Sequence, residues 1–148
     1  MLFCTDLDGT LFTTDKKVSK QNLDAIEYFK SEGGYFTFIT GRMPSTSQSI
    51  CEIINPNAPF GCINGGGIYD RNEKRLIWAA TLPTSALELV NNVYDNLCDI
   101  GIQVNTEKHI YFCRDNSAMV FFRKATGAPL ITRNQNEIDE PILKVVFA

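Results

Sequence analysis

The chain has 148 residues, of which 44% are hydrophobic and 21% are charged. These proportions are ordinary for a globular protein that buries a sizeable core in one domain or in two small ones. The formal net charge of −3 argues against a general binder of nucleic acid or of anionic membranes, because no basic surplus is present to neutralise phosphates. Any phosphate that the protein handles must therefore be bound locally.

The cysteines and the apolar runs predict the cellular compartment of the protein. The five cysteines are odd in number, widely scattered and without C-x-x-C spacing, which predicts neither a disulfide framework nor a zinc site. No run approaches the roughly 18 apolar residues of a membrane span, and the N-terminus does not resemble a signal peptide. We therefore expect a soluble cytoplasmic protein with reduced thiols.

The first half of the chain alternates between strand and helix patterns. The apolar run over residues 2–6 predicts a strand that is buried on both faces. A helix is expected between Ser19, a candidate N-cap, and the Gly33-Gly34 pair. The following patterns predict, in turn, a strand over residues 35–40, a helix over residues 44–54 and a strand over residues 60–63.

This order of elements implies a parallel sheet with right-handed crossovers. In such sheets ligands bind beyond the carboxyl ends of the strands. Asp6, Thr40 and Asn64 stand at the predicted ends. We therefore expect these three residues to converge at one edge of the sheet.

The pattern changes after residue 67. Residues 68–78 and 102–114 each contain two short apolar runs around a polar turn, which predicts two hairpins. The remaining expected elements are helices over about residues 84–98 and 116–125 and a strand over residues 142–148. Because strands no longer alternate regularly with helices, we expect two domains, residues 1–81 of α/β type and residues 82–148 of α+β type. The apolar end of the chain suggests that further material has been cut off.

Two acids in the stretch "LFCTDLDGTLF" point to chemistry. Asp6 and Asp8 repel each other at a strand end, which costs stability unless a cation or a hydrogen-bonding role offsets it. Mg²⁺ prefers oxygen ligands, and a D-x-D turn can supply one side chain and one backbone carbonyl, while Gly9 allows an anion to approach closely. A calcium-binding EF-hand loop is excluded, because its sixth and twelfth positions would be Leu11 and Lys17.

The motifs resemble those of a known family. "DLDGT" after an apolar strand, "ITGR" at a second strand end and "INGGGIYD" at a third are similar to the haloacid dehalogenase superfamily, in its Cof-like sugar-phosphatase branch. The resemblance implies a Rossmann-like parallel-sheet core with an α+β cap domain. It also implies a Mg²⁺-dependent phosphohydrolase that acts on a small phosphorylated metabolite, with the cap selecting the substrate.

The resemblance also implies roles for individual residues. Asp6 matches the nucleophile that becomes an aspartyl-phosphate and binds Mg²⁺, and Asp8 matches the acid/base whose backbone carbonyl lies on the metal. The residues that would hold the transferring phosphoryl group are the Thr40 hydroxyl and the backbone amides of Leu7, Gly9 and Gly41. Arg42 and Asn64 would face the cap and the substrate.

Two motifs of the family are missing from the sequence. A lysine at the end of a later core segment and a G-D-x-x-N-D-like acidic loop are not found, and Lys144 lies in the predicted strand of the cap. This departure keeps two alternatives open, a receiver-like domain and a non-catalytic module that binds phosphate or metal. A receiver would carry its phospho-acceptor at the third strand end, where this chain has Asn64. The sequence names neither the substrate nor the oligomeric state.

Overall fold

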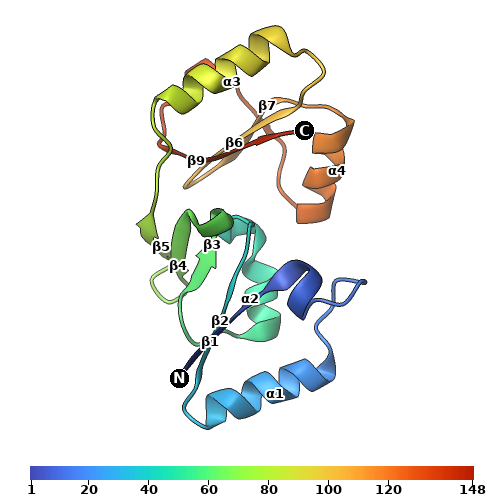
Figure 1. The fold of residues 1–148 in the computed structure, drawn as a ribbon, viewed down its shortest axis with the longest axis vertical. Helices are drawn as coiled ribbons and strands as arrows, with labels where there is room; N and C mark the ends of the chain where they lie inside the picture. Colours follow the sequence, from blue (N-terminus) through green and yellow to red (C-terminus); the bar gives the residue numbers. More distant parts are fainter. The chain divides into compact units, whose positions relative to one another are not determined.

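The computed structural model describes residues 1–148, apart from the side chain of Ala125. The chain divides into two units, residues 1–79 and residues 80–148, and each is described by itself. The first unit contains the strands β1 (Leu2–Asp6), β2 (Tyr35–Ile39), β3 (Phe60–Cys62), β4 (Gly67–Asp70) and β5 (Arg75–Ala79), and the helices α1 (Lys20–Ser31) and α2 (Gln48–Ile54) (Figure 1).

The strands of the first unit form one sheet in the order β1-β2-β3-β4-β5. β1 is parallel to β2, and β2 is parallel to β3, whereas β4 and β5 continue the sheet as an antiparallel hairpin. Asp6 lies opposite Ile39, and Ile39 lies opposite Gly61, so the carboxyl ends of the three parallel strands meet at one edge. The predicted parallel order is therefore confirmed.

Local signals in the sequence account for the first helix. The Ser19 hydroxyl accepts a hydrogen bond from the backbone N–H of Asn22 at 3.1 Å, which caps α1. The helix ends before Gly33, whose φ of +80° is accessible to glycine without strain. Both limits agree with the sequence prediction.

The second helix is shorter than its pattern predicts. A 3₁₀ turn covers Pro44–Thr46, and α2 begins only at Gln48. Between them Ser47 is buried, and its hydroxyl donates to the Met43 carbonyl at 3.0 Å. Such local side-chain bonds compete with the helical ladder, so the single helix predicted over residues 44–54 is wrong in its first half.

The core of the first unit lies between the sheet and its helices. The rings of Phe38 and Phe60 are buried and stack with their centroids 4.6 Å apart. Leu7 and Ile54 are fully buried as well. Complete burial of side chains of this size stabilises the fold by roughly 1.5–3 kcal/mol each.

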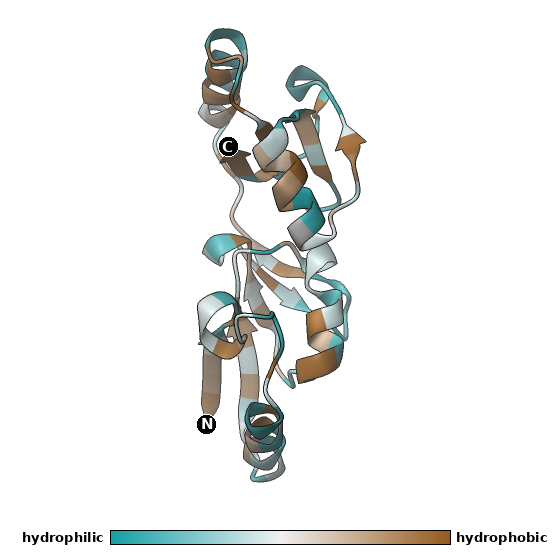
Figure 2. Ribbon diagram, turned by 90° about the vertical axis from the view of Figure 1, so that its right-hand side faces the viewer, coloured by the Kyte–Doolittle hydropathy of each residue, from teal (hydrophilic) through white to brown (hydrophobic). Residues whose placement is uncertain are grey.

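Strand β1 is exposed, in contrast to the prediction that it is buried on both faces. Leu2 and Phe3 keep 60% and 52% of their surface in solvent, although Figure 2 colours the start of this strand as apolar. Within the described residues β1 is an edge strand, with β2 as its neighbour on one side only. The apolar run therefore predicted the strand correctly but not its surroundings.

The second unit is an α+β arrangement. Its elements are α3 (Ser85–Asn96), β6 (Ile102–Thr106), β7 (Ile110–Arg114), α4 (Ser117–Thr126), β8 (Ile131–Thr132) and β9 (Ile142–Phe147). The strands form a sheet in the order β8-β7-β6-β9, which includes the predicted β6-β7 hairpin. Val90 of α3 packs with Ile102, Val104 and Tyr111 in the buried core. No helix of the described residues has the length and apolar character that a membrane crossing requires.

Candidate active site at the carboxyl edge of the first sheet

The candidate site is assembled where the parallel strands end. Asp6 is the last residue of β1, and Thr40 and Asn64 follow β2 and β3. The Thr40 N–H donates to the Gly61 carbonyl at 3.0 Å, and the Asn64 N–H donates to the Thr40 carbonyl at 3.2 Å. These main-chain bonds tie the two loops together at the edge where the sequence places the functional residues.

The loop after β1 turns sharply around a buried anchor. Leu7 is fully buried, and its carbonyl accepts from the Phe12 N–H at 2.9 Å, which closes the turn. Gly9 has a φ of +85°, a left-handed conformation that strains residues with a side chain. The turn leaves both acids at the surface, since Asp6 and Asp8 are exposed.

The Asp8 carboxylate is held by two cations. Arg42 donates from Nε to Oδ2 and from Nη2 to Oδ1, both at 3.1 Å, and Lys16 Nζ lies 2.8 Å from Oδ1. The hydrogen bond from Arg42 is the largest cause that lowers the pKa of Asp8 below its ordinary value, and Lys16 adds to it, while burial acts in the opposite direction. Asp8 is therefore an anion at neutral pH.

The loop after β2 packs tightly against the loop after β3. A Cβ atom at Gly41 would lie 2.9 Å from Asn64 Nδ2 and 3.1 Å from Asn64 Oδ1, so a side chain at residue 41 would displace Asn64. Thr40 is buried, and its hydroxyl oxygen accepts from the Arg42 N–H at 3.3 Å. Because that bond uses the oxygen as an acceptor, the Thr40 hydroxyl keeps a proton to donate.

The backbone at the end of β3 is strained. Ile63 and Asn64 have φ values of +59° and +56°, and the left-handed region is common for asparagine but rare for a β-branched residue. The Ile63 N–H donates to the Arg42 carbonyl at 3.0 Å, which connects this strained pair to the arginine that binds Asp8. Strain of this kind persists where the surrounding structure fixes it, and it clusters at functional sites.

Lys16 is a residue of this cluster that sequence reasoning missed. It lies eight positions after Asp8 in a turn whose ends are joined by an antiparallel bridge between Phe12 and Val18. The motif around Asp6 ends before this turn, so no pattern links the lysine to the acid. A φ of +60° at Lys16 is a structural signal, but it is not readable from the sequence.

The donor chemistry of the two acids fits part of a magnesium site. The Asp6 carboxylate and the Asp8 carbonyl are hard oxygen donors, as Mg²⁺ prefers. Among the described residues no group of three or more His, Cys, Asp or Glu could hold a metal ion. The pair therefore suits Mg²⁺ with most of its coordination left to water, to phosphate oxygens or to groups outside these residues.

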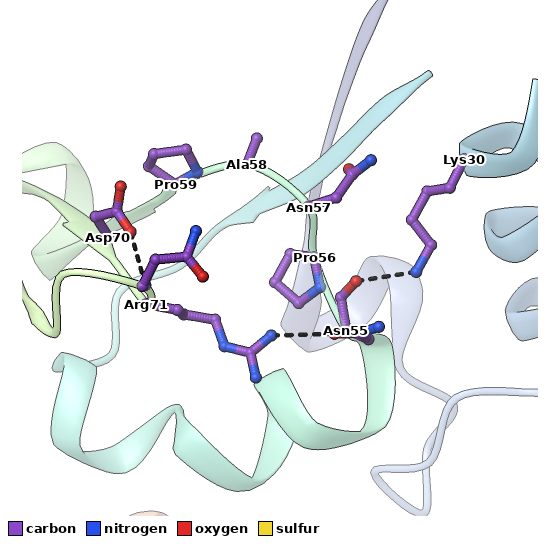
Figure 3. Close-up of a pocket in the computed structure, with 9 residues that line it drawn as sticks. Lys30, Asn55, Pro56, Asn57, Ala58, Pro59, Asp70 and Arg71 are labelled. Carbon is purple, nitrogen blue, oxygen red and sulfur yellow. Dashed lines mark hydrogen bonds between the residues drawn. The ribbon is translucent and has the colours of Figure 1, made fainter. Parts of the chain in front are cut away.

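A pocket of about 440 Å³ lies where the chain enters β3 and leaves β4, and Figure 3 shows its lining residues. Its polar side chains mainly hold the backbone. Asn57 accepts from the Phe36 N–H at 2.7 Å and donates to the Gly34 carbonyl at 2.9 Å, and Lys30 donates to the Asn55 carbonyl at 2.9 Å. None of the predicted site residues lines this pocket.

A second carboxylate cluster lies in the second unit. Glu140 accepts hydrogen bonds from the hydroxyls of Thr106 at 2.7 Å and Tyr111 at 2.6 Å, and its Oε1 lies 3.0 Å from His109 Nδ1. Burial alone would raise the pKa of the Glu140 carboxyl, but these side-chain hydrogen bonds together outweigh it and lower the pKa to about 2. The cluster connects β6 and β7 to the segment before β9.

Comparisons with known proteins identify the family of this chain. A family model described as haloacid dehalogenase-like hydrolase matches residues 3–148. The pyridoxal phosphate phosphatase YbhA of Escherichia coli is 29% identical over 143 residues, which cover 96% of this chain and 48% of that protein.

Solved structures show the same fold. A haloacid dehalogenase-like hydrolase from Bacteroides thetaiotaomicron matches with a TM-score of 0.79 at 19% identity. The match covers 99% of this chain and 57% of the chain of that hydrolase. A subclass IIB sugar phosphatase of the superfamily has a TM-score of 0.81 at 17% identity, over 97% of this chain and 56% of its own. The chain thus spans about half the length of the relatives that it matches. It belongs to the haloacid dehalogenase-like hydrolases, the family that its motifs resemble.

Proposed function

We propose that the protein is a phosphohydrolase that cleaves a small phosphorylated metabolite, such as a sugar phosphate, through an aspartyl-phosphate on Asp6. One observation carries the proposal. The carboxylate of Asp8 is held by Arg42 from the neighbouring strand end, at the edge where Asp6 is exposed and Thr40 is anchored. Family membership supports the same reaction, because the matching relatives are named as phosphatases.

The proposed reaction has two steps. An Asp6 carboxylate oxygen attacks phosphorus and forms the new P–O bond, while the bond to the leaving oxygen breaks and that oxygen takes a proton from Asp8. Asp8 then accepts a proton from water, whose oxygen attacks phosphorus and releases inorganic phosphate from Asp6. The first step needs protonated Asp8, and an anionic phosphate beside it favours that form, because like charges oppose ionisation.

The other residues would hold the phosphoryl group. The Thr40 hydroxyl and the backbone amides of Leu7, Gly9 and Gly41 are the proposed donors to its oxygens, with Arg42 and Asn64 facing the substrate. Asp6 and the Asp8 carbonyl would hold Mg²⁺. That ion neutralises charge on the phosphoryl oxygens when it is bound.

The two units have different proposed roles. Residues 1–81 would form the catalytic core and residues 82–148 the cap that selects the substrate, and we place the boundary in the linker after β5. The cysteines of the described residues are free thiols, which supports a reducing compartment such as the cytoplasm. The alternative is a receiver-like or non-catalytic module that binds phosphate or metal. It is supported because the described residues contain no group of three or more His, Cys, Asp or Glu that could hold a metal ion.

The test is the release of inorganic phosphate by the protein translated from the full reading frame. Its substrates are a panel of sugar phosphates together with pyridoxal 5′-phosphate, each with and without Mg²⁺. We expect Mg²⁺-dependent turnover by the wild type and its loss in Asp6→Asn, because a neutral amide is a poor nucleophile. Circular dichroism controls for folding. Substantial turnover by well-folded Asp6→Asn would reject Asp6 as the nucleophile, and no turnover by the wild type would favour the binding module.

A further inference from the structure

We infer that Lys16 is a phosphate-binding residue of the site, which moves from Asp8 to the phosphoryl group of an incoming ligand. The inference rests on the proposed function, since it names a further residue of the same site. Its starting point is the short contact between Lys16 Nζ and Asp8 Oδ1 at 2.8 Å.

Several hydrogen bonds fix the backbone of the turn that carries Lys16. The Thr13 hydroxyl donates at 2.7 Å to the Asp15 carboxylate and contacts the Lys17 carbonyl at 2.8 Å, and its oxygen accepts from the Lys17 N–H. Main-chain bonds between Thr13 and Lys17 and between Lys16 and Thr13 close the turn. Lys16 itself adopts a φ of +60°, a conformation in which glycine or asparagine would be less strained.

The charges of the described side chains show what such a lysine would contribute. Asp6 and Asp8 carry two negative charges, and Arg42 and Lys16 carry two positive ones, so the four side chains sum to zero. A phosphate ester brings further negative charge to this edge. Mg²⁺ would offset part of this charge, and a lysine that turns toward the phosphate adds a charged donor that neither carboxylate can supply.

The two cations differ in how firmly they are held. Arg42 binds Asp8 through two parallel hydrogen bonds, and its side chain is 20% exposed. Lys16 makes a single contact, and its side chain is 64% exposed on a flexible stem. Arg42 is therefore suited to keep Asp8 oriented, and Lys16 is the cation that can leave Asp8 for a phosphate oxygen.

The neighbouring lysine provides a matched control. Lys17 lies in the same turn and carries the same charge. Its Nζ pairs with Asp15 Oδ2 at 3.4 Å, whereas Lys16 pairs with Asp8, and the Lys17 side chain is 78% exposed. If the turn contributes only general positive charge, the two lysines are equivalent. If Lys16 is a specific ligand, they are not.

The experiment measures the affinity for inorganic phosphate and orthovanadate by calorimetry, in the presence of Mg²⁺, for the wild type and the variants Lys16→Met, Lys17→Met and Lys16→Arg. We expect Lys16→Met to weaken binding about tenfold, the loss of one charge-assisted contact. Lys17→Met should stay within about twofold of the wild type, and Lys16→Arg should restore most of the affinity. Thermal unfolding shows whether each variant is folded.

Each outcome decides the inference. Equal affinities for Lys16→Met and Lys17→Met, or no binding of either anion by the wild type, would overturn it. Anion binding that depends on Lys16 in a protein without turnover would instead sink the proposed hydrolysis and leave the lysine site standing. Turnover by the wild type, together with unchanged anion affinity in Lys16→Met, would overturn the inference about the lysine and leave the proposed hydrolysis standing.

Discussion

Two carboxylates of this chain, Asp8 and Glu140, are each held by several partners but in different ways. The partners of Asp8 are two cations on loops, and 40% of its side chain is exposed. The partners of Glu140 are mainly hydroxyls on the strands β6 and β7, and 23% of its side chain is exposed. Glu140 thus connects strands, whereas Asp8 connects charged side chains of two loops, of which Lys16 can exchange its partner.

A network of hydrogen bonds around a carboxylate does not by itself identify a functional site. Ion pairs that solvent reaches contribute little to folding, so the half-exposed Asp8 carboxylate is available for another task. A carboxylate that receives hydroxyl hydrogen bonds at a strand junction stabilises the fold. We therefore expect substitutions of Asp8 to affect activity and substitutions of Glu140 to affect stability.

The largest effect is expected for Asp8→Asn in the full-length protein. Loss of the proposed acid/base should lower phosphatase turnover by roughly 10²–10⁴-fold. The free energy of unfolding should change by about 1 kcal/mol or less, because 40% of the Asp8 side chain is exposed and solvent screens its two ion pairs. Asp24→Asn, which breaks an exposed pair with Lys20 on α1, is the control and should leave both quantities unchanged. A large loss of stability in Asp8→Asn would show that Asp8 is a structural residue like Glu140.

Glu140→Gln is expected to lower stability and leave activity unchanged. The amide cannot accept all the hydrogen bonds that the carboxylate receives, so the free energy of unfolding should fall by about 1.5–3 kcal/mol. Denaturant titration measures this change, and the chemical step should be unaffected. Glu107→Gln, at the exposed tip of the β6-β7 hairpin, serves as the control. Equal stability of the two variants would show that Glu140 does not hold the strands.

The pH dependence of unfolding tests the contribution of Glu140 to stability. The pKa of Glu140 is lowered to about 2 in the folded chain from an ordinary value of 4.5. Its contribution to stability is therefore fully present above about pH 4.5 and is lost as the pH falls toward 2. Denaturant unfolding between pH 7 and pH 3 should show this loss in the wild type and a flatter dependence in Glu140→Gln. Identical pH profiles would contradict the assignment.

The smallest effect is expected for Tyr111→Phe. The substitution removes the hydroxyl that donates to Glu140 at 2.6 Å but keeps the buried ring in the core. We expect a loss of about 0.5–1.5 kcal/mol in the free energy of unfolding and no change in turnover. A loss as large as that of Glu140→Gln would mean that the ring has also moved, which an aromatic proton spectrum would detect.

Much of the fold could be predicted because local signals and tertiary structure agree. The cap at Ser19, the glycines after α1 and the parallel strand order all follow from side-chain and backbone preferences. Asn116 likewise caps α4, where its side chain accepts from the Met119 N–H at 2.9 Å. The two-residue strand β8 was not predicted, since two residues are too few to show a period.

The candidate site was predicted only where a motif marks it. Asp6, Thr40 and Asn64 follow apolar runs, so topology brings them together before any contact is known. The contact between Lys16 and Asp8 depends on a left-handed turn and on a side-chain rotamer, neither of which has a sequence pattern. The exposure of Phe3 depends on what lies beside β1, which local sequence cannot express.

The exposed edge of β1 has a consequence for the behaviour of the chain in solution. Among the described residues no strand pairs with β1 on the side away from β2, so its main-chain N–H and C=O groups there form a template for another strand, with Leu2 and Phe3 beside it. Pairing at such an edge is bimolecular, so the 148-residue chain should be monomeric when dilute and should associate as its concentration rises. Light scattering and turnover measurements on the isolated chain therefore depend on dilution, and any assay of this chain has to state its protein concentration.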